Sequence, residues 1–142
     1  MKCNGLVIRV ICMLGLLSVI LSAMGCYQGK EKAYYSDKDN YISGEAIVDN
    51  IIYDEEDHRL FLWLSEIDES YQDSTFKIEG NNVDLLMQSA LFREISVGSR
   101  ITFVSAPRYF GDGYCMPIVA LSYNDVILLS FDEGYENLMS LF

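Results

Sequence analysis

The chain has little of what metal centres and disulfide frameworks are built from. Its 142 residues include one histidine, four cysteines and two prolines. A single histidine cannot supply the converging His and Cys side chains of a zinc site. Neither a Walker loop nor the glycine pattern of dinucleotide-binding folds is present in the sequence. We therefore expect no metal and no cofactor.

A long hydrophobic run is also lacking. Residues 10–23 carry no charge, but these 14 residues fall short of the roughly 20 that a membrane-spanning helix needs. Lys2 and Arg9 precede the run and small residues follow it, which is typical of a cleaved signal peptide. We expect residues 1–25 to be this signal peptide.

The stretch SAMGC, residues 22–26, resembles the lipobox of bacterial lipoproteins. Gly25 and Cys26 match its two demanding positions, while Ala23 stands where leucine is commonest. The resemblance implies that Cys26 is diacylated and becomes the first residue after cleavage. Each buried methylene contributes about 0.8 kcal/mol, so two acyl chains would anchor the protein to the extracytoplasmic face of the cell membrane. The alternative is an ordinary signal peptide with an incidental cysteine.

Positive charge is scarce in the rest of the chain. The 117 residues after the signal peptide hold all 21 acidic residues but only eight basic ones, a net charge of −13. Such a field repels phosphate backbones, and we expect no nucleic-acid partner. With Cys26 lipidated, Cys115 has no cysteine to pair with in this part of the sequence, and we expect it to be a small buried hydrophobe.

The mature chain divides into two segments. Residues 26–40 hold the lipidated cysteine and a polar stretch without periodicity, for which we expect a flexible tether. Residues 41–142 carry the patterns of a single folded domain. β-branched and aromatic residues bounded by turn signals predict strands over 41–53, 60–67, 74–80, 97–106 and 116–124. Residues 125–131 either continue the last strand or form a sixth.

Helical periodicity interrupts these strands once. Residues 81–95 carry apolar side chains at helical spacing, with Asn81 or Asn82 as the expected N-cap. A second, short amphipathic helix is expected over residues 135–142, where Tyr135, Leu138, Met139 and Phe142 share a face.

This order of elements resembles the OB-fold, a five-stranded Greek-key barrel, over residues 41–131. A first strand containing Gly44, the internal helix and the turn VGSR carry the resemblance. In that turn Gly98 matches the glycine of the common "kGd" pattern, and Ser99 departs from its aspartate. More narrowly, the chain resembles small bacterial lipoproteins with an OB-like, anticodon-binding-like domain. The predicted fold class is therefore mainly β, with a short C-terminal helix; another small β-sandwich or an α+β domain are the alternatives.

The segment RYFGDGY, residues 108–114, is one candidate ligand-binding site. In an OB barrel it joins the fourth and fifth strands beside the ligand face. Arg108, Tyr109, Phe110 and Tyr114 would offer a cation and stacking surfaces. The alternative, which turn chemistry favours, is a tight hairpin whose glycines supply positive φ angles while the aromatic residues pack on the barrel.

Trp63 is the other candidate. Strand alternation places it on one face with Phe61, opposite three leucines. It is either a stacking platform for a ligand or a residue that packs beneath the C-terminal helix, and we expect the packing role.

The remaining patterns do not predict catalysis. Residues 54–58 place four carboxylates beside His58, but consecutive hairpin residues point in different directions, so we expect a solvated acidic loop. No nucleophile motif accompanies His58. The sequence therefore predicts a non-catalytic binding module whose partner is an envelope protein or a wall glycan. A small envelope hydrolase using acidic residues is the alternative, and a nucleic-acid binder ranks last.

Overall fold

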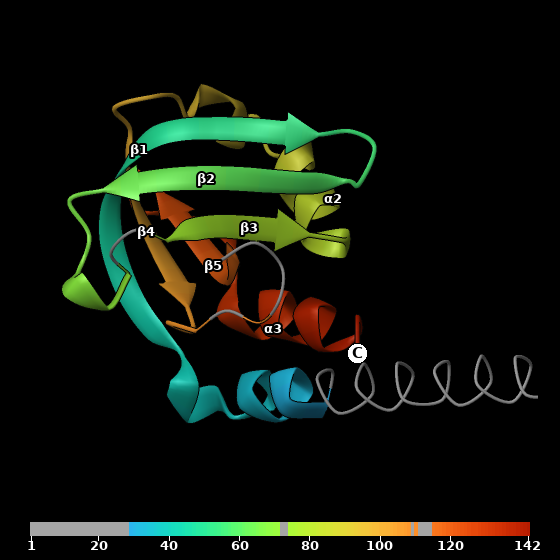
Figure 1. Cartoon of the computed structure of the whole chain (residues 1–142). Coiled ribbons are helices and arrows are strands. Elements are labelled where there is room, and N and C mark those ends of the chain that lie inside the picture. The colour runs from blue at the N-terminus through green and yellow to red at the C-terminus, as the bar shows by residue number, and fades with distance from the viewer. Residues whose placement is uncertain (1–28, 72–73, 109, 111–114) are drawn as a thin grey trace, which may run out of the picture.

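Six strands form one sheet that closes on itself in the computed structural model, which describes residues 29–71, 74–108, 110 and 115–142. The strand order is β3-β2-β1-β4-β5-β6, and a parallel pairing of β3 with β5 closes the barrel. The other neighbouring strands pair antiparallel. The strands and the two labelled helices are β1 (Ile42–Asp54), β2 (Arg59–Ser65), β3 (Thr75–Glu79), α2 (Asn81–Gln88), β4 (Arg100–Ser105), β5 (Cys115–Tyr123), β6 (Val126–Leu129) and α3 (Phe131–Met139) (Figure 1).

The predicted fold class is confirmed. Five strands close in the OB-like order, α2 connects β3 to β4, and α3 ends the chain. Residues 126–129 form a sixth strand rather than an extension of β5. Asn124 and Asp125 separate the two strands with φ angles of 52° and 61°, the left-handed conformation of a two-residue hairpin turn.

The internal helix is shorter than predicted. It ends at Gln88, and a separate 3₁₀ turn covers Phe92–Glu94. Ser89 is extended, and its hydroxyl accepts a hydrogen bond from the Phe92 amide at 3.3 Å. A serine that bonds to the nearby backbone competes with helical pairing, which explains the break.

Three aromatic rings pack against one another in the core of the barrel. Tyr71, Phe76 and Phe103 are fully buried, with ring centroids 5.1–5.6 Å apart. The Tyr71 hydroxyl donates to the carbonyl oxygens of Ile42 at 3.0 Å and Ser105 at 3.1 Å. One side chain thus ties the first residue of β1 to the last residue of β4.

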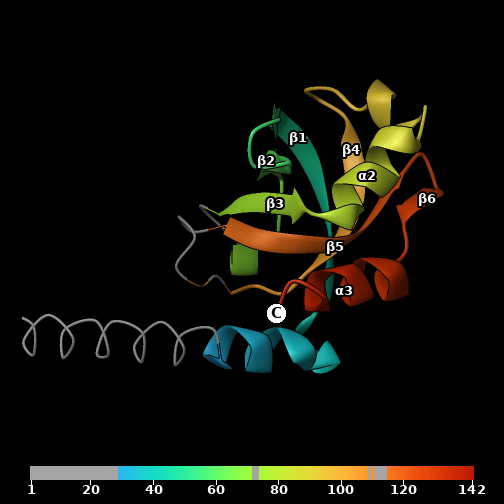
Figure 2. The same ribbon diagram turned by 90° about the vertical axis from the view of Figure 1, so that its right-hand side faces the viewer.

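Residues 29–40 are not the flexible tether that the sequence predicted. Residues 29–36 form a helix, and a 3₁₀ turn follows at Lys38–Asn40. Tyr35 is only 2% exposed and packs with Phe110 and Leu138 in a second core beside the barrel. Figures 1 and 2 show this helix alongside α3. Burial of tyrosine rings offsets the entropy that a polar segment loses on ordering. Residues 26–28 lie outside the described residues.

The helix α3 lies directly on β5. A Cβ atom added to Gly134 would come within 1.9 Å of the Val119 carbonyl oxygen. Asn82, only 3% exposed, donates its amide to the Gly134 carbonyl at 3.0 Å and accepts from Asn137 at 2.9 Å. The predicted N-cap at Asn81 or Asn82 is therefore wrong: Gly80 is the N-cap, and the Asn82 side chain instead joins α2 to α3.

Candidate ligand-binding face

The outer surface of β1, β2 and β3 carries two neighbouring aromatic rings. Phe61 and Trp63 point outward from β2 while Leu60 and Leu62 point into the core, as the alternation predicts. Their ring centroids lie 6.5 Å apart, and Trp63 is 36% exposed. Across the strands Ile52, 47% exposed, lies opposite Phe61. We call the surface of Ile52, Phe61 and Trp63 the aromatic face; its strands lie toward the viewer in Figure 1.

A network of charges borders the aromatic face. Lys77 is opposite Phe61 and Glu79 is opposite Arg59 in the register of β2 and β3. One Glu79 oxygen lies 2.9 Å from the Lys77 ammonium, and the other lies 3.3 Å from Arg59 Nε. The Lys77 side chain is 9% exposed and that of Glu79 is 16% exposed, so solvent screens these pairs weakly. Polar groups are therefore held in fixed positions beside the two rings.

Trp63 does not pack beneath the C-terminal helix, so that prediction is wrong. The helix α3 instead packs against β5 and against the N-terminal segment, where its Phe131 and Tyr135 rings contact Tyr41 at 5.5 and 5.8 Å. The sequence placed Tyr41 at the start of the first strand, but no local pattern showed that this end of the strand meets the last helix. The stacking role of Trp63 is the alternative that its exposure supports.

Of the four candidate residues after β4, the structure describes Arg108 and Phe110. Phe110 is 8% exposed and packs against Tyr34 and Tyr35, with ring centroids 5.7 and 5.6 Å away. The Arg108 guanidinium lies 4.9 Å from the Phe110 ring and 5.2 Å from the Tyr34 ring. Phe110 therefore serves packing, as the turn interpretation predicted. Tyr109, Tyr114 and the glycine turn lie outside the described residues.

The acidic hairpin uses its own carboxylate to shape the turn. The Asp54 side chain accepts from the amides of Glu56 at 3.0 Å and Asp57 at 3.3 Å. His58 has a φ angle of 52° and joins two elements: its Nδ1 lies 2.8 Å from the Tyr53 hydroxyl, and its Nε2 lies 3.0 Å from an Asp84 oxygen. The sequence separation of 26 residues hid this link between the hairpin and α2. Among the described residues, no cluster of three His, Cys, Asp or Glu side chains is placed to hold a metal ion.

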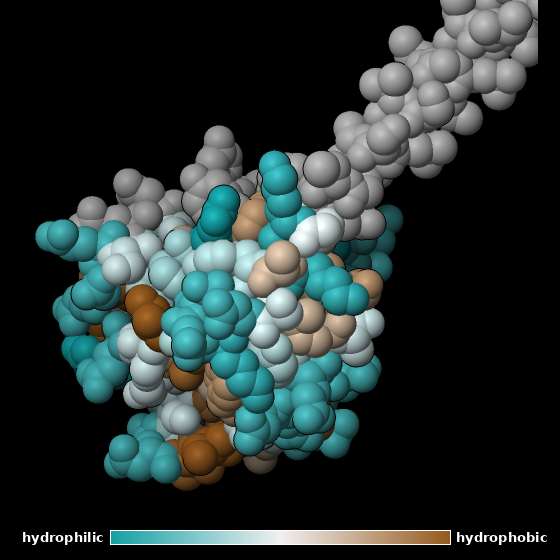
Figure 3. Space-filling view, turned by 90° about the horizontal axis from the view of Figure 1, so that it is seen from below, coloured by the Kyte–Doolittle hydropathy of each residue, from teal (hydrophilic) through white to brown (hydrophobic). Residues whose placement is uncertain are grey.

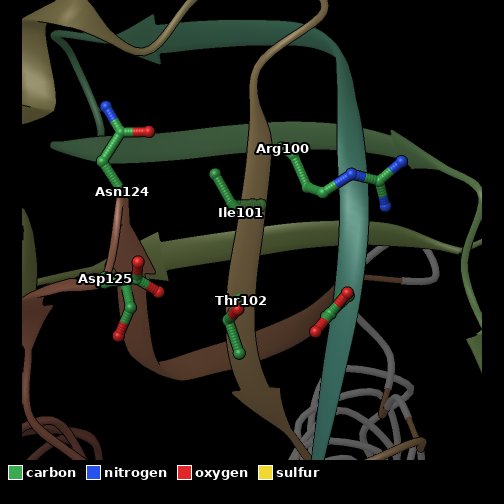
Figure 4. Close-up of a pocket in the computed structure, with 7 residues that line it drawn as sticks. Arg100, Ile101, Thr102, Asn124 and Asp125 are labelled. Atoms are coloured by element: carbon green, nitrogen blue, oxygen red, sulfur yellow. The ribbon is translucent and has the colours of Figure 1, made fainter.

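A shallow hollow lies on a different part of the surface, over β1, β4 and β5 (Figure 4). It measures about 470 Å³ and is lined by Glu45, Arg100, Ile101, Thr102, Ser122, Asn124 and Asp125. The Arg100 guanidinium is paired with Glu66 at 2.7 Å. Strand alternation turns the polar side chains of these strands outward, and the hollow lacks the aromatic surface that distinguishes the aromatic face.

The remaining sequence predictions concern the cysteines and the membrane. Cys115 is buried at the start of β5, as predicted. Cys26 lies outside the described residues. Within residues 29–71, 74–108, 110 and 115–142, no helix is long and apolar enough to cross a membrane.

Sequence reasoning missed the residues that surround Phe61 on this face, which are Arg59, Lys77, Glu79 and Ile52. Alternation alone assigns faces within a strand, whereas these residues meet through the pairing register of three strands. In comparisons with known proteins, no family model, curated protein or solved structure matches the chain.

Proposed function

We propose that the chain is a non-catalytic binding module of the bacterial cell envelope that takes a neutral glycan strand on the aromatic face. An acylated Cys26 holds it on the extracytoplasmic side of the membrane. The SAMGC stretch supports the anchor. The neighbouring rings of the exposed Trp63 and the half-buried Phe61 on the OB-like barrel carry the binding proposal.

Two adjacent rings on a sheet suit the chemistry of sugars. The C–H faces of a pyranose ring are apolar, and aromatic side chains offer large surfaces for such contacts at low entropic cost. One Glu79 oxygen lies 2.9 Å from Lys77 and the other lies 3.3 Å from Arg59, so polar groups are already held in place beside Phe61, where the hydroxyl groups of a bound sugar would lie. In OB-folds this face of strands two and three is a recurrent site for oligosaccharides and oligonucleotides.

The net charge of the chain favours an oligosaccharide over an oligonucleotide. The net charge of −13 after residue 25 opposes the approach of a phosphate backbone and leaves a neutral glycan unaffected. The acid–base chemistry of a hydrolase finds less support here, because both oxygens of Glu79 face cations at 2.9 and 3.3 Å.

The binding proposal is tested by titrating the isotopically labelled chain from residue 27 with soluble wall-glycan fragments. We expect saturable amide shifts that cluster at 59–63 and 75–79 and quenching or enhancement of Trp63 fluorescence. Trp63→Ala should abolish the amide shifts, whereas the matched control Val97→Ala, at a residue 67% exposed outside this face, should keep both the amide shifts and the fluorescence response. Shifts confined to other segments, or no shift at saturating glycan, would refute the glycan proposal; crosslinking on intact cells would then identify a protein partner.

The anchor is tested separately. Full-length chain expressed in a bacterial host should incorporate labelled fatty acid and sediment with membranes. Cys26→Ser should release it into the soluble fraction. Equal membrane association of both forms would contradict lipidation at this cysteine.

A further inference from the structure

The lipid anchor and the barrel are separated by very little chain. Cys26 precedes the first described residue, Gly29, by three positions. Three residues span at most about 11 Å. The helix 29–36 then begins at once and is packed against the domain. From this we infer that one end of the molecule rests on the bilayer surface: the membrane end, formed by residues 29–32 together with Leu141 and Phe142. The inference depends on the proposed lipidation of Cys26.

The helix cannot swing away from the domain without breaking several contacts. The Tyr35 hydroxyl donates to the Arg108 carbonyl at 2.7 Å, and that of Tyr135 donates to the Ser36 carbonyl at 2.8 Å. Tyr41 donates to the Tyr35 carbonyl at 2.9 Å. Because Tyr35 is also 2% exposed, the direction in which the helix leaves the barrel is fixed. The short link from Cys26 to Gly29 therefore places the bilayer against one defined side of the molecule.

That side carries exposed apolar residues next to lysines. Leu141 is 50% exposed and Phe142 is 38% exposed, and both line a hollow of about 220 Å³ with Gly29 and Lys32. The Phe142 ring lies 6.3 Å from Tyr35, which places it beside the helix. Apolar side chains enter the boundary of the acyl chains, while lysines extend their ammonium groups to the headgroups.

Charge distribution favours the same orientation. Residues 29–40 hold three lysines and three acidic residues and are neutral, although the chain after residue 25 carries −13. The segment nearest the anchor is therefore repelled least by anionic headgroups. Figure 3, seen from this side, shows apolar residues scattered among polar ones. Such a surface orients an anchored protein but does not bind a membrane alone.

The orientation leaves the aromatic face free. The segment 95–99 lies at the opposite end of the barrel from the helix 29–36, and β2 lies between them (Figures 1 and 2). A ligand can then approach the aromatic face from the side without displacing lipid.

Tryptophan quenching by brominated lipids measures this orientation, because the chain has a single tryptophan. Full-length protein is purified from its host and reconstituted in vesicles whose acyl chains carry bromine, which quenches only at close range. Wild type reports position 63. Two double variants, Trp63→Phe with Leu141→Trp and Trp63→Phe with Phe142→Trp, report the membrane end, and Trp63→Phe with Val97→Trp is the matched distal control. Circular dichroism verifies that each variant is folded.

We expect severalfold stronger quenching at 141 or 142 than at 63 or 97. Equal quenching at all four positions, or the strongest at 63 or 97, overturns the orientation. The mass of the purified chain shows independently whether Cys26 carries acyl chains. If Cys26 is unmodified, the proposed lipidation fails, and its thiol is coupled to a maleimide lipid so that the same quenching comparison still decides the orientation.

Discussion

Replacing Gly134 with alanine tests how α3 is held on the barrel. In an ordinary helix interior this change stabilises by roughly 0.5–1 kcal/mol, because alanine has less backbone entropy to lose. Here the new methyl group would lie 1.9 Å from the Val119 oxygen and 2.7 Å from its carbonyl carbon. Both atoms belong to the backbone of a central strand and cannot rotate away. The helix must move instead, and the sign of the effect reverses.

The size of the loss follows from two contributions. Overpacking of a well-packed contact costs about 1–3 kcal/mol. Displacing the helix also breaks the buried bond from Asn82 to the Gly134 carbonyl, now 3.0 Å long, which costs about 1–3 kcal/mol more. After subtracting the alanine gain we expect Gly134→Ala to lower the free energy of unfolding by about 3 kcal/mol. For a domain of this size that lowers Tm by roughly 10–15 °C.

Urea and thermal unfolding of the chain from residue 27 measure this loss. Gly29→Ala is the matched control, since a Cβ atom there meets nothing within 4 Å, and its stability should be unchanged or slightly higher. If Gly134→Ala proves as stable as wild type, α3 does not pack on β5 as closely as described, and the reasoning is refuted.

Three further results are expected from the buried residues around the barrel. Tyr71→Phe removes the donor shared by the Ile42 and Ser105 carbonyls and should cost about 1–3 kcal/mol in urea unfolding; a loss below measurement error would contradict that role. Ser105→Ala should stabilise by about 1 kcal/mol, because the Ser105 hydroxyl is buried with no hydrogen-bond partner among the described residues, and a destabilised variant would disprove this. Burial raises the pKa of the Tyr35 and Tyr71 hydroxyls above their ordinary value of about 10. The contribution of these two hydroxyls to the free energy of unfolding is complete below pH 10 and is lost as pH rises further, by at most about 1.4 kcal/mol per pH unit for each. When the free energy of unfolding is measured between pH 8 and 11, its decrease with pH should become steeper above pH 10, and this decrease should be smaller in Tyr35→Phe.

The strands were predictable because each carries its own local signal. The alternation of Leu60 to Leu64 fixes which side chains point inward whatever the partner strand is. For residues 125–131 the sequence left open a continuation of the fifth strand or a sixth strand, and only the pairing of β6 with β5 shows that a new strand forms. Local patterns therefore predicted the order of elements, and the resemblance of that order to the OB-fold predicted the barrel.

The candidate face and the N-terminal helix depend on distant parts of the chain. Glu79 meets Arg59 across two strands, and pairing register is set by packing of the whole core rather than by either segment. Tyr35 lies in a short segment rich in charge, where no periodicity signals a helix. Its burial becomes favourable only once Phe110 and Leu138 supply a surface to pack on.

The position of β5 has a consequence for how the chain acquires its structure. This strand pairs with β3, β4 and β6 and supports α3, yet it begins only at Cys115. A nascent chain ending at residue 114 has every element up to β4 but no strand to close the ring, so its apolar interior stays open to proteases and chaperones. The barrel therefore cannot close until residues 115–123 are available to pair with β3 and β4.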